Sequence, residues 1–125
     1  MKMKKISIII PCYNEQESLP IFYKECTQVL NSLNYNYELI FVNDGSADGT
    51  LDILRQLSSA DPHVTYLSFS RNFGKESAML AGFHASQVGS GADFVTIMDA
   101  DMQDPPSLLP EMLEILETEN YDSVA

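Results

Sequence analysis

Short apolar runs alternate with longer segments of helical periodicity along this chain, and this alternation restricts the fold more than any other feature of the sequence. The apolar runs cover residues 6–10, 38–42, 64–69 and 94–98. Helical patterns cover residues 19–33, 51–57, 76–85 and 107–117. Such alternation is typical of βα units that build a parallel sheet between layers of helices. The sequence therefore predicts an α/β protein, a three-layer α/β/α sandwich with a mainly parallel sheet, in which residues 121–125 begin a fifth strand.

Two of the predicted helices have clear amphipathic patterns. In the first, apolar residues recur at steps of three and four, Ser18 stands at the N-cap position and Pro20 fits the first turn. In the last, the inward positions are Leu109, Met112, Leu113 and Leu116. The acidic residues of that helix then face water, and we interpret them as a solvated face and not as a site. These residues are Glu111, Glu114 and Glu117.

The chain of 125 residues, of which 45% are hydrophobic, has room for one domain with one core. Its first apolar run stops at Pro11, so we expect neither a signal peptide nor a membrane-spanning helix there. Cys12 and Cys26 lack the spacing of metal ligands, and we interpret them as reduced, buried thiols of a cytoplasmic protein. His63 and His84 have no second His or Cys at ligand spacing, so we expect structural roles for both.

Charge is distributed unevenly along the sequence. Residues 1–75 contain all seven Lys and Arg residues and eight acidic residues, whereas residues 76–125 contain ten acidic residues and no Lys or Arg. The second part would repel a nucleic acid or an anionic membrane surface, so we expect no nucleic-acid partner. A phosphorylated ligand bound there would need a divalent cation to offset its charge.

Each predicted strand is followed by a polar cluster, and in open parallel sheets ligands bind outside the carboxyl ends of the strands. The clusters cover residues 11–15, 43–46, 70–75 and 99–106. Taken alone, each suits an ordinary turn or helix start, as the Asn-Asp-Gly-Ser sequence of the second cluster does. Four such clusters at one edge of a sheet favour a shared site. Signatures of dinucleotide-binding loops, P-loops and hydrolase motifs are absent from the sequence.

The fourth cluster contains the best candidate metal ligands. Residues two apart on an extended chain point the same way, so Asp99 and Asp101 can present carboxylates to one point, with the side-chain oxygen of Gln103 next in line. Such oxygen ligands suit Mg²⁺ or Mn²⁺, which commonly complete their coordination with substrate phosphates. Arg71 and Lys75 are the only basic residues near this cluster in the predicted arrangement. A short acidic pair alone is a weak sign of a metal site.

Four segments, IIIPCYNE, FVNDGSADGT, SRNFGKESAMLAG and MDADMQDPP, together resemble family 2 glycosyltransferases of the GT-A fold. Within that family the chain is most similar to the polyprenyl-phosphate branch, which includes dolichyl-phosphate mannose synthases and bactoprenol glucosyltransferases. The resemblance implies that residues 1–125 are the nucleotide-sugar-binding part of a GT-A domain that continues beyond Ala125. It also implies that the full-length protein acts at the cytoplasmic face of the membrane, through membrane segments missing from this chain.

The resemblance also implies roles for individual residues. Contacts to the nucleotide sugar are implied for Pro11, Tyr13, Glu15, Asp44, Arg71, Lys75, Asp99 and Ala100. Binding of Mg²⁺ or Mn²⁺ is implied for Asp99, Asp101 and Gln103, and the two aspartates are also the implied catalytic residues.

The implied activity is the inverting transfer of a sugar from a nucleoside-diphosphate sugar, with a UDP-sugar expected, to a polyprenyl phosphate. Three alternatives remain open. The chain could belong to a family 2 transferase that acts on a saccharide hydroxyl, it could be a module that binds nucleotide sugars without catalysis, or it could be a structural domain whose acidic turns have no ligand.

Overall fold

The computed structural model describes residues 3–88, 91–101, 105–119 and 123–124. Within these residues the strands are β1 (Lys5–Cys12), β2 (Asn36–Asn43), β3 (Val64–Ser68), β4 (Phe94–Ile97) and β5 (Ser123–Val124). The helices are α1 (Leu19–Asn31), α2 (Thr50–Ala60), α3 (Lys75–Ser86), the 3₁₀ helix η1 (Pro106–Leu108) and α4 (Leu109–Glu119). All the predicted strands and helices are present, and α2 is longer than its apolar pattern indicated.

The five strands form one sheet in the order β3-β2-β1-β4-β5, and all neighbouring strands are parallel. The chain builds outward from β1 to β3 and then returns across β2 and β1 to form β4 on the other side of β1. This reversal makes the carboxyl ends of β1 and β4 a topological switch point, the place where open parallel sheets bind ligands.

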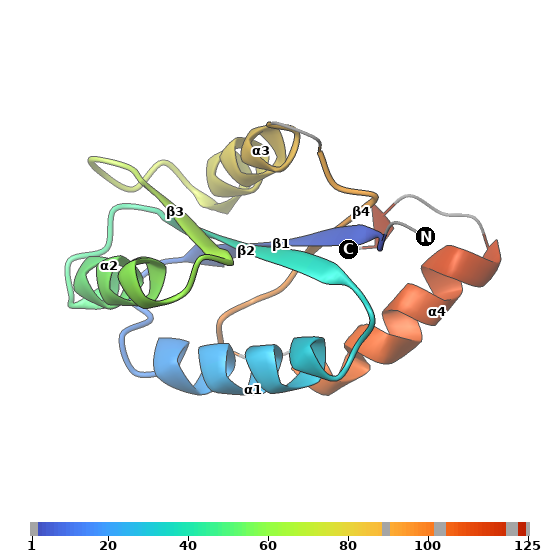
Figure 1. Cartoon of the computed structure of the whole chain (residues 1–125). Helices are drawn as coiled ribbons and strands as arrows, with labels where there is room; N and C mark the ends of the chain where they lie inside the picture. The colour runs from blue at the N-terminus through green and yellow to red at the C-terminus, as the bar shows by residue number, and fades with distance from the viewer. Residues whose placement is uncertain (1–2, 89–90, 102–104, 120–122, 125) are drawn as a thin grey trace.

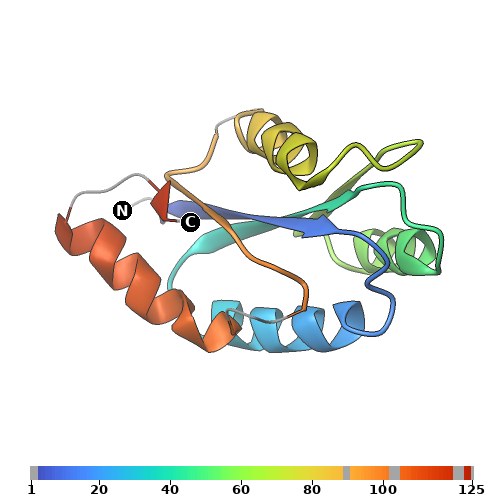
Figure 2. The same cartoon turned by 180° about the vertical axis from the view of Figure 1, so that it is seen from behind.

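Helices cover both faces of the sheet, as predicted. Figures 1 and 2 show α1 and α4 below the sheet and α3 above it. The larger apolar core lies between the sheet and α1, α2 and α4, and includes an edge-to-face contact of Phe22 with Phe41 at 6.3 Å between ring centroids. The smaller core lies on the α3 side and includes Ile9, Ile40 and Ala78. The protein is therefore a three-layer α/β/α sandwich.

A glycine sets the distance between α3 and the sheet. A Cβ atom at Gly82 would lie 2.4 Å from Cγ2 of Ile9 on β1, so no larger residue fits without a shift. This close packing keeps α3 against the central strand. The amino end of α3 is consequently held near the switch point.

The structure adds side-chain contacts to two sequence-based expectations about α1 and α4. Ser18 occupies the N-cap position of α1, but its backbone is helical and its hydroxyl donates to the carboxylate of Glu15 at 2.7 Å instead of capping the helix. An N-cap side chain normally requires an extended backbone at that position. The acidic residues of α4 are exposed as predicted, and Glu117 also accepts hydrogen bonds from Lys4 and Tyr35, which connect α4 to the residues just before β1 and β2.

Both cysteines are buried free thiols, which confirms the packing role predicted for them. Burial raises the pKa of the Cys26 thiol to about 12. His63 stacks on Tyr37 at 4.0 Å between ring centroids and lies 2.9 Å from Oδ1 of Asp61, which agrees with a structural role.

Candidate functional site

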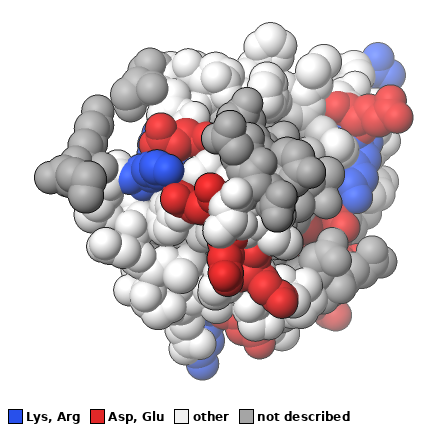
Figure 3. All heavy atoms as spheres, turned by 90° about the vertical axis from the view of Figure 1, so that its right-hand side faces the viewer, with Lys and Arg blue, Asp and Glu red and all other residues white. Residues whose placement is uncertain are grey.

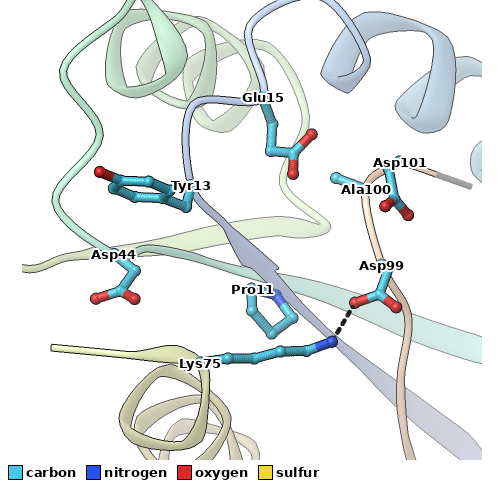
Figure 4. A pocket seen from close by; sticks show the side chains of 8 residues that line it. All are labelled: Pro11, Tyr13, Glu15, Asp44, Lys75, Asp99, Ala100 and Asp101. Atoms are coloured by element: carbon cyan, nitrogen blue, oxygen red, sulfur yellow. Dashed lines mark hydrogen bonds and ion pairs between the residues drawn. The ribbon is translucent and has the colours of Figure 1, made fainter. Parts of the chain in front are cut away.

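A cavity of about 220 Å³ lies at the switch point (Figure 4). Its lining residues lie at or after the carboxyl ends of β1, β2 and β4 or begin α3, and they are Pro11, Tyr13, Glu15, Asp44, Lys75, Asp99, Ala100 and Asp101. The structure thus brings together residues from all four predicted polar clusters. Small-molecule pockets typically measure roughly 300–1,000 Å³, so the described residues enclose only part of such a ligand.

The loops that follow β1 and β2 are joined by reciprocal hydrogen bonds beside this cavity. Asn14 has a positive φ of 54°, and its side-chain oxygen accepts the backbone N–H of Ala47 at 2.8 Å. The backbone N–H of Asn14 donates to the Ser46 hydroxyl at 2.9 Å. Gln16 in turn accepts the backbone N–H of Gly49 at 2.7 Å. These bonds hold Asn14 and Gln16, the residues next to Tyr13 and Glu15, and the sequence analysis did not identify them.

Asp48 and Thr50 complete this junction. The Thr50 hydroxyl accepts the backbone N–H of Glu15 at 2.9 Å and donates to Asp48. Burial raises the pKa of Asp48, but hydrogen bonds from the Thr50 hydroxyl and from backbone N–H groups lower it by more, so the pKa lies below its ordinary value. The Asp48 carboxylate therefore stays ionised and acts as a fixed acceptor between the two loops.

Asp44 connects the end of β2 to the loop before α3. Its carboxylate is buried, with 4% of the residue exposed, and accepts the backbone N–H groups of Phe73 at 2.8 Å and Gly74 at 3.0 Å. Asn72 donates to the same carboxylate at 3.1 Å. A Cβ atom at Gly45 would lie 2.2 Å from the backbone carbon of Arg71, so the two loops touch directly. Asp44 thus has a structural role that the resemblance did not indicate.

Lys75 is the first residue of α3 and the basic residue that lines the cavity. Its Nζ lies 2.8 Å from Oδ1 of Asp99, as the dashed line in Figure 4 marks. Arg71, the other predicted cation, is not among the lining residues, and its guanidinium lies over the ring of Phe73 with Cζ 4.4 Å from the ring centroid. The structure therefore brings one of the two predicted basic residues into the cavity.

Asp99 and Asp101 line the same cavity, but they are not alternate residues of an extended strand, as the sequence analysis assumed. β4 ends at Ile97, and Ala100 and Asp101 already lie in a turn. Figure 4 shows both aspartates on the same side of the cavity. Ala100 between them is 1% exposed and contributes to the wall. Asp101 also borders a neighbouring cavity of about 340 Å³, which shares Glu15 with the first.

The donor set in the cavity is compatible with a hard divalent cation. Carboxylate oxygens, such as those of Asp99 and Asp101, are the ligands that Mg²⁺ and Mn²⁺ prefer. Among the described residues no three His, Cys, Asp or Glu side chains are grouped so as to hold a metal by themselves. Gln103, the third predicted ligand, lies outside the described residues. A cation bound here would therefore depend on additional ligands, as Mg²⁺ does when it binds substrate phosphates.

Acidic charge is not confined to the cavity. Figure 3 shows the face at the right of Figure 1, and red acidic atoms are more widespread on it than blue basic atoms. The net charge of −11 agrees with this view. What distinguishes the cavity is thus not acidity alone but the convergence of four strand and helix ends at the switch point.

Comparisons with known proteins agree with this geometry. Residues 7–125 match the family described as Glycosyl transferase family 2. The putative glycosyltransferase CsbB of Bacillus subtilis (strain 168) is 44% identical over 124 residues, which cover 99% of this chain and 36% of that protein. The bactoprenol glucosyl transferase of Shigella phage SfV is 44% identical over 111 residues, which cover 88% of this chain and 34% of that protein. The chain thus spans about a third of the length of these relatives.

Solved structures share the fold at low sequence identity. The mannosyltransferase PcManGT from Pyrobaculum calidifontis, solved in complex with GDP-Man and Mn²⁺, has a TM-score of 0.68 and 21% identity over 93% of this chain and 33% of that chain. The glucosyl-3-phosphoglycerate synthase of M. tuberculosis has a TM-score of 0.66 and 23% identity over 92% of this chain and 41% of that chain. No helix within the described residues is long and apolar enough to span a membrane. On the family match and the fold, this chain belongs to glycosyltransferase family 2 and has the GT-A fold.

Proposed function

We propose that this chain binds a nucleoside-diphosphate sugar in the switch-point cavity and forms the donor-binding part of an inverting glycosyltransferase. The observation that carries the proposal is the convergence, in one cavity, of side chains that follow β1, β2 and β4 and begin α3. Tyr13 lines this cavity and is 50% exposed, so its ring offers an apolar face to a nucleotide base. Pro11 and Glu15 extend the same wall toward the ribose.

Charge supports a divalent cation as part of donor binding. The cavity lining contains the carboxylates of Glu15, Asp44, Asp99 and Asp101 and one ammonium group, that of Lys75. A diphosphate placed there would be repelled unless further positive charge were present. Mg²⁺ or Mn²⁺ held by Asp99 and Asp101 would supply that charge and stabilise the leaving nucleoside diphosphate as a Lewis acid. Gln103 is a third proposed ligand, on the resemblance alone.

Polyprenyl phosphate is the proposed acceptor. Relatives at 40–44% identity are named bactoprenol glucosyl transferase and undecaprenyl-phosphate 4-deoxy-4-formamido-L-arabinose transferase. An inverting transfer is a single in-line displacement at the anomeric carbon, and a lipid phosphate is already ionised at neutral pH. The acceptor therefore needs no strong general base, whereas a saccharide hydroxyl would need one. We propose that the whole protein acts at the cytoplasmic face of a membrane, where such lipids and nucleotide sugars meet.

Transfer of sugar by the whole protein, from radiolabelled UDP-glucose to undecaprenyl phosphate in detergent, tests whether the acceptor is a lipid phosphate. Label should move into the organic phase with undecaprenyl phosphate but not with undecaprenol, which has a hydroxyl in place of the phosphate. Equal transfer to both would contradict a phosphate acceptor. Binding of UDP without transfer to either would favour the binding module, and absence of UDP binding would favour a structural domain.

A further inference from the structure

The ion pair between Lys75 and Asp99 lies across the cavity and joins two different elements. Lys75 is the first residue of α3, and Asp99 follows β4. Their charged atoms are 2.8 Å apart, and the side chains are 58% and 26% exposed. A lysine at the amino end of a helix is electrostatically unfavourable, because the helix dipole places partial positive charge there. Helix stability therefore does not explain this lysine, whereas its carboxylate partner does.

The backbone of Lys75 is held while its side chain can turn. Gly74, the residue before it, donates its backbone N–H to the buried carboxylate of Asp44, and so does Phe73. The helix that follows packs closely on β1 at Gly82. The lysine side chain, by contrast, is more than half exposed and has a long, flexible stem. Rotation about its side-chain bonds can thus move the ammonium group within the cavity without moving α3.

We infer that Lys75 is the counter-ion of Asp99 when no ligand is bound and that it exchanges partners, from Asp99 to the diphosphate, when a divalent cation and a nucleotide bind together. The inference rests on the proposed function. A cation that approaches Asp99 would meet the ammonium group at hydrogen-bond distance from the same carboxylate, and the two positive charges repel each other. The ammonium group must therefore leave Asp99, and the diphosphate is the anion that can receive it.

This exchange couples the two ligands. Without nucleotide, a cation at Asp99 must break the ion pair of Lys75, and no added anion is present to receive the released ammonium group. With nucleotide present, the released ammonium group pairs with a phosphate oxygen, so the loss is offset. Lys75 thus weakens binding of the cation alone and strengthens binding of the cation together with a nucleoside diphosphate. The two effects of Lys75 on affinity thus have opposite signs, and this distinguishes the exchange from a simple charge effect.

Calorimetric titration of the 125-residue chain with Mn²⁺ alone, and with UDP at saturating Mn²⁺, tests the inference in the parent and in Lys75→Met. The variant should bind Mn²⁺ alone about two- to fivefold more tightly, the range that corresponds to one exposed ion pair. Its affinity for UDP at saturating Mn²⁺ should fall about ten- to a hundredfold, the range of a hydrogen bond to a charged group. Lys75→Arg keeps the charge and should bind Mn²⁺ alone as the parent does.

Lys24→Met is the matched control, because Lys24 is exposed on α1 and lines a different cavity. It removes the same charge and should leave both affinities unchanged. The inference would be overturned if Lys75→Met bound Mn²⁺ no more tightly than the parent does. It would also be overturned if neither chain bound Mn²⁺. An equal gain in Mn²⁺ affinity in Lys24→Met would overturn it as well. Failure of the proposed function would be seen separately, as absence of UDP binding by the parent chain at saturating Mn²⁺.

Discussion

Asn72 binds Asp44 through two hydrogen bonds: its Nδ2 donates to the Asp44 carbonyl oxygen at 3.2 Å and to Oδ2 at 3.1 Å. Together with the backbone donors of Phe73 and Gly74, it surrounds the Asp44 carboxylate at the amino end of α3. A helix amino end favours an anion at this position. The end of β2 therefore determines where α3 begins, and with it where Lys75 lies.

Asp44→Ala should destabilise the protein by about 2–4 kcal/mol, because each buried donor left without an acceptor costs about 1–3 kcal/mol. Chemical denaturation monitored by circular dichroism measures the loss. Asp52→Ala is the control, since the ion pair of Asp52 with Arg55 is exposed, and its cost should be about 0.5 kcal/mol or less. Similar losses in the two variants would show that Asp44 has no special structural role.

Gly45→Ala and Gly91→Ala separate steric contact from backbone strain. Both glycines have φ of 70°, but a Cβ atom at Gly45 would lie 2.2 Å from the Arg71 backbone, whereas at Gly91 it would meet nothing within 4 Å. Gly91→Ala should therefore cost about 1–2 kcal/mol from the left-handed backbone alone. Gly45→Ala should cost about 1–3 kcal/mol more, from the steric overlap. Equal losses in thermal denaturation would mean that the loops do not meet as described.

Tyr23→Phe should change stability in a manner that depends on pH. The Tyr23 hydroxyl donates to Asp61 at 2.6 Å. Burial and this hydrogen bond raise the pKa of Tyr23 to about 12. For Asp61, burial raises the pKa, but hydrogen bonds from Tyr23 and His63 lower it by more, and the net shift is downward.

The signs of these shifts define the pH window. A lowered carboxyl pKa contributes stability that is full above the unfolded pKa of about 4 and is lost as the pH falls through the folded pKa. A raised tyrosine pKa contributes stability that is full below the unfolded pKa of about 10 and is lost as the pH rises through about 12. Between these limits, the free energy of unfolding of the parent should exceed that of Tyr23→Phe by about 1 kcal/mol, and at either extreme the difference should be smaller.

Tyr66→Phe is the control for this pH series. Tyr66 is half-buried, and its hydroxyl has no hydrogen-bond partner among the residues that the structure describes. The stability of Tyr66→Phe should therefore change with pH in the same way as that of the parent. A Tyr23→Phe difference that stays constant from pH 3 to pH 11 would contradict the hydrogen bond to Asp61.

Asp101→Asn and Glu114→Gln each remove one negative charge, so an effect of net charge alone would change the melting temperature equally in both variants. Asp101 lines the cavity, whereas Glu114 is exposed on α4. Without ligands, the melting temperature of Asp101→Asn should be unchanged or slightly raised, because closely spaced carboxylates repel one another. The increase in melting temperature that Mn²⁺ plus UDP gives the parent should be lost in Asp101→Asn and kept in Glu114→Gln. A full increase in Asp101→Asn would contradict its role as a metal ligand.

The fold and the place of the site could be predicted from the sequence, because both depend on local patterns. Apolar runs mark the buried strands, and the carboxyl ends of parallel strands share one edge of the sheet. That is why Tyr13, Asp44 and Asp99, from three separate clusters, could be predicted to line one cavity.

The contacts that hold the site could not be predicted, because they join residues far apart in the sequence. Asn14 and Ala47 are 33 residues apart, and the left-handed backbone of Asn14 is common enough for asparagine to give no specific signal. The partner of Lys75 is 24 residues away and depends on how α3 sits against β4. Ser18 shows the opposite case, since a local capping pattern was overridden by the nearby carboxylate of Glu15.

Calorimetric titration of this chain with UDP, in Mn²⁺ and again in EDTA, tests the central claim most directly. The cavity contains four carboxylates and one lysine among its lining residues, so a diphosphate should bind well only when a divalent cation offsets the charge. The account predicts binding in Mn²⁺ and an affinity weaker by about tenfold or more in EDTA, which corresponds to about 1.4 kcal/mol or more. Equal affinity in Mn²⁺ and in EDTA would contradict metal-assisted binding of the nucleotide at this site.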